Sequence, residues 1–115
     1  MSDLEELTKL VIKFRDERDW KQFHTPKDLA ISLALESAEV LEHFQWKNPT
    51  EIKKYIKTNK DDIADELADV FKYLLMLSYE LNIDLKKAVP SKMAKDNKKY
   101  PVEKSKGKHA KYTEL

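Results

Sequence analysis

Residues 33–41 read LALESAEVL and residues 63–71 read IADELADVF, so nearly the same pattern occurs twice, thirty positions apart. Alanine and valine recur at matching positions, and each stretch carries two carboxylates three residues apart. These are Glu36 and Glu39 in the first stretch, and Glu66 and Asp69 in the second. Side chains three or four positions apart share one face of an α-helix. The repeat therefore predicts two amphipathic helices whose apolar faces also carry acids.

Acids on an apolar face need a partner, because taking a carboxylate out of water costs several kcal/mol. Two such helices facing each other would bring four carboxylates together, which favours Mg²⁺ or Mn²⁺, with Ca²⁺ also open. Zinc does not fit, because the chain has no cysteine and no histidine pair with ligand spacing. A ferritin-type di-iron site needs Glu-x-x-His, whereas His43 follows Glu39 by four residues and Asp69 follows Glu66 by three.

The composition is that of one helical domain. The chain has 115 residues, of which 41% are hydrophobic and 37% charged, and a single glycine leaves few places for tight turns. No apolar run approaches the roughly 20 residues of a membrane span, and the first residues lack the core of a signal peptide. Without cysteine there are no disulfides, and nothing points to secretion. We expect a cytoplasmic protein.

We expect an all-α fold of four main helices in an antiparallel bundle, with a short connecting helix. Capping residues mark where the main helices start: Ser2, Thr25 before Pro26, Asp61 or Asp62, and Asp84. The second helix should run to about Gln45, and residues 50–58 should form the connector. Pro90 should kink or interrupt the last helix.

The end of the chain is predicted to be an extended basic arm. We place a helical bundle in residues 1–99 and the arm in residues 100–115 of the same single domain. Residues 86–115 hold ten lysines against three acids, a net charge of +7 in a chain whose total is +1. By composition this segment is a solvated end, a nucleic-acid contact or a phosphate contact for a small ligand.

The four acids and several flanking segments together resemble a known family, the MazG-like all-α nucleoside triphosphate pyrophosphohydrolases. The resemblance extends over essentially the whole chain and is strongest to the compact branch that includes deoxycytidine triphosphatase-like proteins. Its flanking segments are RDW at 18–20, FHTP at 23–26, FQW at 44–46, KYPV at 99–102 and AKYT at 110–113.

The resemblance implies hydrolysis of a (deoxy)nucleoside triphosphate between its α- and β-phosphates, giving a monophosphate and pyrophosphate, with nucleotide-pool cleaning as the role. It implies that Glu36, Glu39, Glu66 and Asp69 are the catalytic and metal-binding residues, holding Mg²⁺ with Mn²⁺ as a substitute. It also implies six substrate-binding residues: Trp20, His24, Trp46, Tyr73, Lys104 and Lys111. Among these, Tyr73 has the alternative of a core aromatic, and His24 that of a loop anchor.

Relatives of this kind assemble as dimers or dimers of dimers with active sites built partly from a second chain, so we expect a homo-oligomer. Besides the nucleotide we expect neither a membrane nor a nucleic acid as partner. Two rival functions stay open at this point. One is a non-catalytic helical interaction module whose acids hold a structural cation, and the other is nucleic-acid binding through the lysine-rich end.

Overall fold

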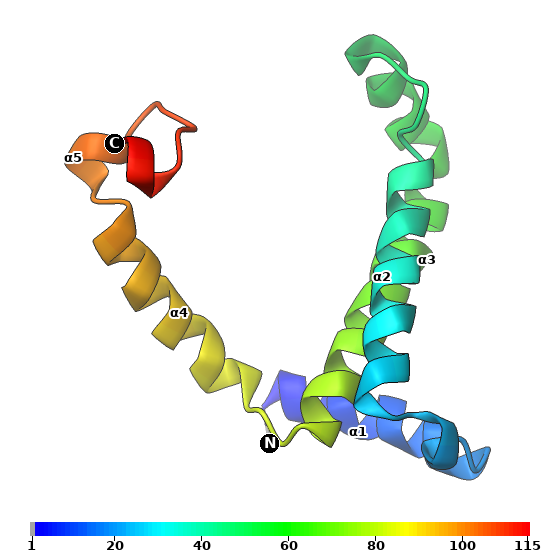
Figure 1. Ribbon diagram of the computed structural model, residues 1–115. Helices are drawn as coiled ribbons and strands as arrows, with labels where there is room; N and C mark the ends of the chain where they lie inside the picture. The colour runs from blue at the N-terminus through cyan, green and yellow to red at the C-terminus, as the bar shows by residue number, and fades with distance from the viewer. Residues whose placement is uncertain (1) are drawn as a thin grey trace. The chain divides into compact units, whose positions relative to one another are not determined.

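The computed structural model describes residues 2–115, and in that range it contains helices and turns but no strand (Figure 1). The prediction of an all-α fold is confirmed. Its α-helices are α1 (Asp3–Glu17), α2 (Pro26–Glu42), α3 (Pro49–Glu80), α4 (Leu85–Lys99) and α5 (Val102–Ser105), with 3-10 turns η1 (Lys21–Phe23) and η2 (Tyr112–Glu114).

The chain forms two compact units that divide after Asn82. The first unit holds α1, α2 and α3, and the second holds α4, α5 and η2. Within the first unit, α2 and α3 lie side by side and run in opposite directions, while α1 packs against the final turns of α3 (Figure 1). The boundary between residues 99 and 100 stays a prediction.

Side-chain caps fix where the helices begin, and those at Ser2, Thr25 and Asp84 are predicted from the sequence, whereas the cap at Asn48 is not. The Ser2 hydroxyl accepts a hydrogen bond from the Glu5 amide at 3.2 Å, and the Thr25 hydroxyl accepts one from the Asp28 amide at 3.2 Å. Asn48 and Glu51 form a reciprocal capping box at the start of α3. Each cap satisfies an amide that has no partner within its helix.

The predicted break between a connecting helix and the next long helix is present as a kink. Helix α3 runs from Pro49 to Glu80, but Asn59 is non-helical, at φ −122° and ψ 20°, two residues before the predicted cap at Asp61 or Asp62. The Asn59 side-chain amide donates to the Tyr55 carbonyl at 3.0 Å, which supplies a partner for a carbonyl at the kink and lets the helix resume. The preceding helix, α2, ends at Glu42, three residues before the predicted end at Gln45.

The second unit also differs from expectation. Helix α4 runs continuously through Pro90, so the proline removes one amide donor and the predicted interruption is absent, whereas the alternative of a kink stays a prediction. The segment after Tyr100 is not extended, because it contains α5 and η2. The Tyr100 and Tyr112 rings meet edge to face at 5.9 Å, and the Lys99 ammonium lies 5.0 Å from the Tyr112 ring centre. These contacts fold the arm back onto the end of α4.

The core of the first unit lies where all three of its helices meet. Ile12 of α1, Leu29 of α2 and Met76 of α3 are buried against one another. Beside them, the Arg15 side chain is only 2% exposed and forms ion pairs with Glu80 of α3 and with its neighbour Asp16. Burial of this guanidinium is tolerated because its charge is paired. The core and this ion pair together fix α1 to the end of α3.

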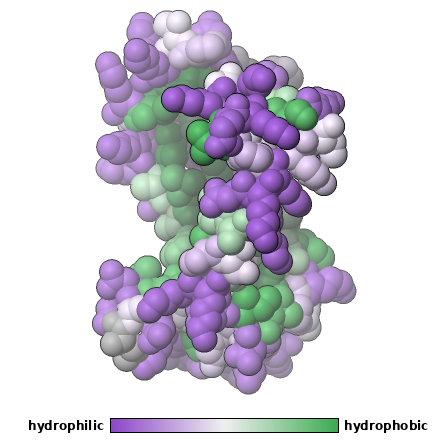
Figure 2. All heavy atoms as spheres, turned by 90° about the vertical axis from the view of Figure 1, so that its left-hand side faces the viewer, coloured by the Kyte–Doolittle hydropathy of each residue, from purple (hydrophilic) through white to green (hydrophobic). Residues whose placement is uncertain are grey.

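Many large apolar side chains are exposed at the surface. Figure 2 shows apolar residues (green) interspersed among hydrophilic ones (purple). On α2 and α3 the exposed apolar residues include Leu35, at 62%, and Leu67, at 53%. Within residues 2–115, none of the helices has the length and apolar character needed to cross a membrane. The predicted cytoplasmic location stays a prediction.

Candidate active site

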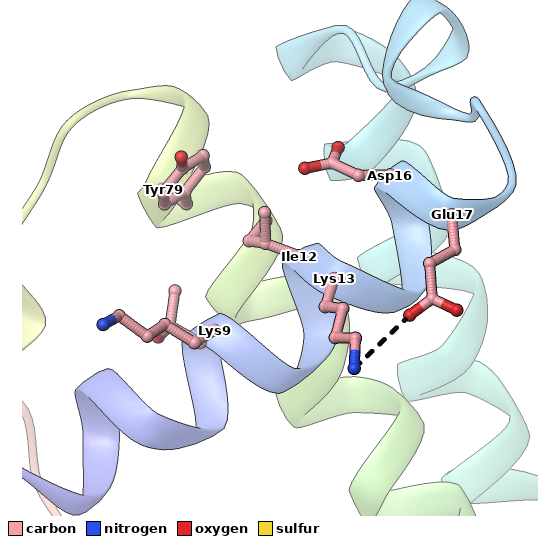
Figure 3. Close-up of a pocket in the computed structure, with 7 residues that line it drawn as sticks. Lys9, Ile12, Lys13, Asp16, Glu17 and Tyr79 are labelled. Atoms are coloured by element: carbon pink, nitrogen blue, oxygen red, sulfur yellow. Dashed lines mark ion pairs between the residues drawn. The ribbon is translucent and has the colours of Figure 1, made fainter.

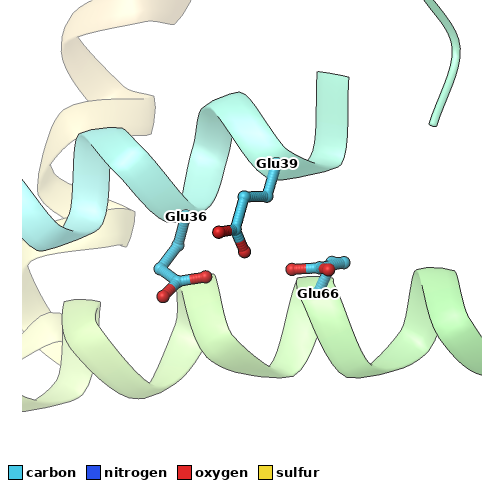
Figure 4. A group of neighbouring side chains, drawn as sticks. All are labelled: Glu36, Glu39 and Glu66. Atoms are coloured by element: carbon cyan, nitrogen blue, oxygen red, sulfur yellow. The ribbon is translucent and has the colours of Figure 1, made fainter. Parts of the chain in front are cut away.

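Three carboxylates from α2 and α3 converge about two helical turns beyond the core residue Leu29. Glu36 and Glu39 on α2 point toward Glu66 on α3 (Figure 4). Each offers an oxygen, and these oxygens all lie within 4.8 Å of one another. The prediction that the two repeated stretches face each other is therefore seen directly in the packing of the two helices.

The electrostatics of the cluster centre on Glu39. Burial is the largest cause that raises the pKa of Glu36, followed by the hydrogen bond that its protonated carboxyl donates to Glu39 and by the charges of Glu39, Asp69 and Glu66. For Glu66, the largest cause that raises the pKa is the hydrogen bond that its protonated carboxyl donates to Glu39, followed by burial and the charges of Glu39 and Asp69; the charge of His43 acts in the opposite direction. Both neighbours are therefore harder to ionise because of Glu39.

The cluster fits a hard divalent cation. The Oε2 atoms of Glu36 and Glu66 are buried and have no hydrogen-bond partner among residues 2–115. Buried polar atoms in native proteins nearly always have a partner, and carboxylate oxygens are the ligands that Mg²⁺ and Mn²⁺ prefer. Glu36, Glu39 and Glu66 would hold such an ion.

The fourth predicted acid, Asp69, is near the cluster but is not one of the three converging groups. It lies one turn after Glu66, and its carboxylate is 3.4 Å from the Lys72 ammonium. Its charge still acts on the pKa of Glu36 and of Glu66. A metal-binding role for Asp69 stays a prediction.

The predicted base-contacting residues are not brought together within one chain. Trp20 and His24 precede α2, whereas Trp46 follows it. Because α2 has 17 residues, these two groups are separated by the length of a helix of about 25 Å. A single subunit therefore cannot place all three side chains around one base.

Trp20, His24 and Trp46 also differ in their surroundings. Trp20 meets the Phe14 ring edge to face at 5.7 Å. His24 is half-buried, its Nδ1 has no partner within the described residues, and its pKa is lowered by burial first and then by the charge of Arg15. Trp46 is 91% exposed and has a φ of 67°, a left-handed conformation that tryptophan rarely adopts.

The other predicted substrate residues lie elsewhere. Tyr73 is half-buried against the core, in keeping with its alternative role as a core aromatic, and the Lys72 ammonium lies 5.2 Å from its ring centre. Lys104 and Lys111 are exposed and belong to the second unit, the first in α5 and the second just before η2.

One contact near the acids was not predicted. The Nδ1 atom of His43, one turn after Glu39, lies 2.6 Å from the hydroxyl oxygen of Tyr55 on α3. A signal was present in the sequence, since His43 follows Glu39 by four residues and so shares its helix face. The partner could not be found, because the contact joins two helices and depends on how α2 packs against the first part of α3.

A separate groove of about 430 Å³ lies between α1 and the end of α3 (Figure 3). Its lining carries both signs of charge, with the Lys13 ammonium 3.9 Å from Glu17. The full lining is Thr8, Lys9, Ile12, Lys13, Asp16, Glu17 and Tyr79. None of the predicted site residues lines it.

Comparisons with known proteins agree on one activity. A model described as the MazG-like family matches residues 31–115. The chain is 42% identical over 114 residues to dCTP pyrophosphatase 1 of Mus musculus, and 38% identical over 114 residues to the Homo sapiens protein of the same name. Each alignment covers 97% of this chain and 67% of the relative. The crystal structure of a pyrophosphatase from Archaeoglobus fulgidus, 41% identical, superposes with a TM-score of 0.83 over 88% of this chain and 94% of that one.

We expect the metal-free protein to lose stability as pH rises above about 4.5, the ordinary pKa of a glutamate. Because folding raises the pKa of Glu36 and Glu66, the folded state holds more protons than the unfolded state between that value and the raised ones. The contribution of Glu36 and Glu66 to the free energy of unfolding is thus present at lower pH. It is lost as pH rises through the pKa values that these two groups have in the folded state. Melting temperatures followed by circular dichroism in EDTA, from pH 4.5 to 8, measure this loss.

Replacing Glu39, which interacts with both Glu36 and Glu66, tests whether the acid cluster causes the loss of stability as pH rises. Glu39→Gln should raise the melting temperature at pH 8 by a few degrees and flatten its decline, because one charge that opposes both neighbours is removed. The exposed Glu42, on the same helix, supplies the control Glu42→Gln, which should leave the decline unchanged. An equal effect of the two substitutions would show that the decline does not arise in the cluster. Because folding lowers the pKa of His24 from its ordinary value of 6.5, this residue makes stability rise with pH below that value. The effect of His24 is the same in the unsubstituted protein, in Glu39→Gln and in Glu42→Gln, so it does not affect the comparison.

Proposed function

The chain belongs to the MazG-like family and is a nucleotide pyrophosphohydrolase, and we propose that it uses Mg²⁺ to cleave (deoxy)nucleoside triphosphates between the α- and β-phosphates. The products would be a nucleoside monophosphate and pyrophosphate. We propose dCTP as a substrate because the relatives at 38–42% identity are named for it. Removal of unwanted triphosphates from the nucleotide pool is the role that we propose for this reaction.

One observation carries the proposal of metal dependence: two buried carboxylate oxygens, from Glu36 and Glu66, lack any partner within the described residues. An arrangement that keeps like charges close and incompletely paired is destabilising by itself. Such strain at a cluster of acids is typical of a functional site. The non-catalytic alternative has no comparable support, because the relatives are enzymes by name.

Different residues of this chain would bind the metal ion, position its ligands and contact the phosphates. A divalent cation held by Glu36, Glu39 and Glu66 would supply charge neutralisation of the triphosphate and a more acidic water. Glu39, which interacts with both neighbours, would fix the relative positions of Glu36 and Glu66. Lys104 and Lys111 are proposed to contact phosphate oxygens, since ammonium groups favour the negative charge that accumulates on a leaving pyrophosphate.

We expect pyrophosphate, and not orthophosphate, to be released when the protein is incubated with dCTP and Mg²⁺, and we expect EDTA to stop the release. Glu39→Gln should lower kcat at least about 100-fold, because it removes a metal ligand while preserving the side-chain shape. A pyrophosphate-specific coupled assay measures both effects. Circular dichroism should show that the variant stays folded.

Glu42→Gln is again the matched control and should keep normal turnover. Orthophosphate as the first product, or normal turnover by Glu39→Gln, would contradict the assigned reaction or the assigned site respectively.

We further propose that the active form is a homo-oligomer, a dimer or a dimer of dimers, in which a second chain completes the base site. The separation of Trp20 and His24 from Trp46 by the whole of α2 supports this. So does the exposure of Leu35 and Leu67 on the two helices that carry the acids, because large exposed apolar patches commonly mark protein interfaces.

Light scattering coupled to gel filtration should give a mass that is at least twice the 13.6 kDa of one chain. Leu35→Asp should lower this mass and lower turnover together, since a carboxylate in an apolar interface would be desolvated without a partner. A fully active species of 13.6 kDa would contradict the shared site.

Trp46 gives a test in which stability and function should move in opposite directions. Its left-handed backbone, at φ 67°, costs an ordinary residue roughly 1–2 kcal/mol. Trp46→Gly should therefore not destabilise the protein, yet it should raise the KM for dCTP about tenfold, because stacking on a base is worth roughly 1–3 kcal/mol. Denaturant unfolding and steady-state kinetics measure the two quantities.

Trp46→Phe is the control, and it should retain most of the affinity because it keeps an aromatic face. If Trp46→Gly left KM unchanged, the contact between Trp46 and the base would be wrong.

A further inference from the structure

Helices α2 and α3 meet a second time on the far side of the acids from the core. There the His43 Nδ1 atom and the Tyr55 hydroxyl oxygen are 2.6 Å apart, and the two rings lie 5.7 Å apart, centre to centre. Both side chains are half-buried. The Lys47 ammonium, 4.3 Å from the centre of the Tyr55 ring, covers the same ring. This is a polar contact with support on several sides, and the proposed reaction assigns no role to it.

The contact is placed so that it can act on the acid cluster. His43 follows Glu39 by one helical turn. Tyr55 lies on the first part of α3, and its own carbonyl accepts a hydrogen bond from the Asn59 side chain at the kink. The remainder of α3, with Glu66, begins directly after that kink. The position of Tyr55 is thereby tied to the direction in which the Glu66 segment leaves it.

The pair of helices needs such a contact at this end. At one end, α2 and α3 are held by Leu29, Met76 and the rest of the apolar core. Between the ends, three carboxylates with oxygens within 4.8 Å of one another push the helices apart when ionised. No residue of α2 beyond Leu29 is fully buried. The His43–Tyr55 hydrogen bond therefore opposes separation at the end of the helix pair that lies away from the buried core.

We propose that His43 and Tyr55 are positioning residues that hold α2 and α3 at the spacing at which Glu36, Glu39 and Glu66 bind a divalent cation. The inference rests on the proposed function, because it takes the three acids to be metal ligands. Residues behind the ligands of a metal site commonly change metal affinity by about 10–100-fold. A hydrogen bond between the helices acts on all three ligands together, since it sets their separation.

Binding of Mn²⁺ to the full-length protein without nucleotide tests this, with free Mn²⁺ measured by electron paramagnetic resonance. Tyr55→Phe and His43→Leu should each raise the Kd for Mn²⁺ about tenfold. The double variant should be no weaker than either single variant, because both remove the same hydrogen bond. His43→Asn should restore most of the affinity, since the asparagine amide can reach the place of Nδ1 but carries no titratable charge.

Tyr79→Phe is the matched control. It removes a hydroxyl from the same helix, on an exposed ring that lines the separate groove, and should leave the Kd unchanged. A lower melting temperature of Tyr55→Phe with an unchanged Kd would mean that the contact only stabilises the fold, which overturns the inference. Failure of His43→Asn to restore binding would overturn the hydrogen-bond explanation. Failure of the unsubstituted protein to bind Mn²⁺ would instead overturn the proposed function.

Discussion

The antiparallel contact between α2 and α3 is the constraint on which the rest of the structure depends. The same two helix faces bury Leu29 and Met76 at one end and collect Glu36, Glu39 and Glu66 farther along. Apolar burial favours close approach of the helices, whereas the carboxylates oppose it. The spacing of the helices is a compromise between these two effects, and it leaves the three acids with oxygens within 4.8 Å of one another.

That compromise explains why the site has its charge properties. Burial and mutual repulsion both raise the pKa of Glu36, and the hydrogen bond that protonated Glu66 donates to Glu39 is the largest cause for Glu66. A divalent cation would reverse the balance, since it attracts the same oxygens that otherwise repel one another. The protein thus contributes a prearranged set of ligands, and the apolar core that α2 shares with α3 opposes their mutual repulsion.

The relation between one chain and the complete site follows from helix length. Acids in the middle of α2 can form a metal site with α3 alone, because those two helices are adjacent. Aromatic residues that flank α2 cannot reach a common point within the same chain, because about 25 Å of helix separates them. The exposed leucines on α2 and α3 offer the surface through which a second chain could supply what is missing.

The sequence by itself determined the helical class, the caps at Ser2 and Thr25, and the pairing of two acidic helices, because capping and periodicity are local properties of the chain. It indicated a break after residue 58 but could not determine that the two segments join through a kink at Asn59, where a side-chain hydrogen bond to the Tyr55 carbonyl supports the backbone. Only the tertiary structure decided that three acids converge while Asp69 lies beside Lys72, and that His43 meets Tyr55. These contacts join different helices or depend on rotamers, and such distances are set by packing and not by sequence spacing.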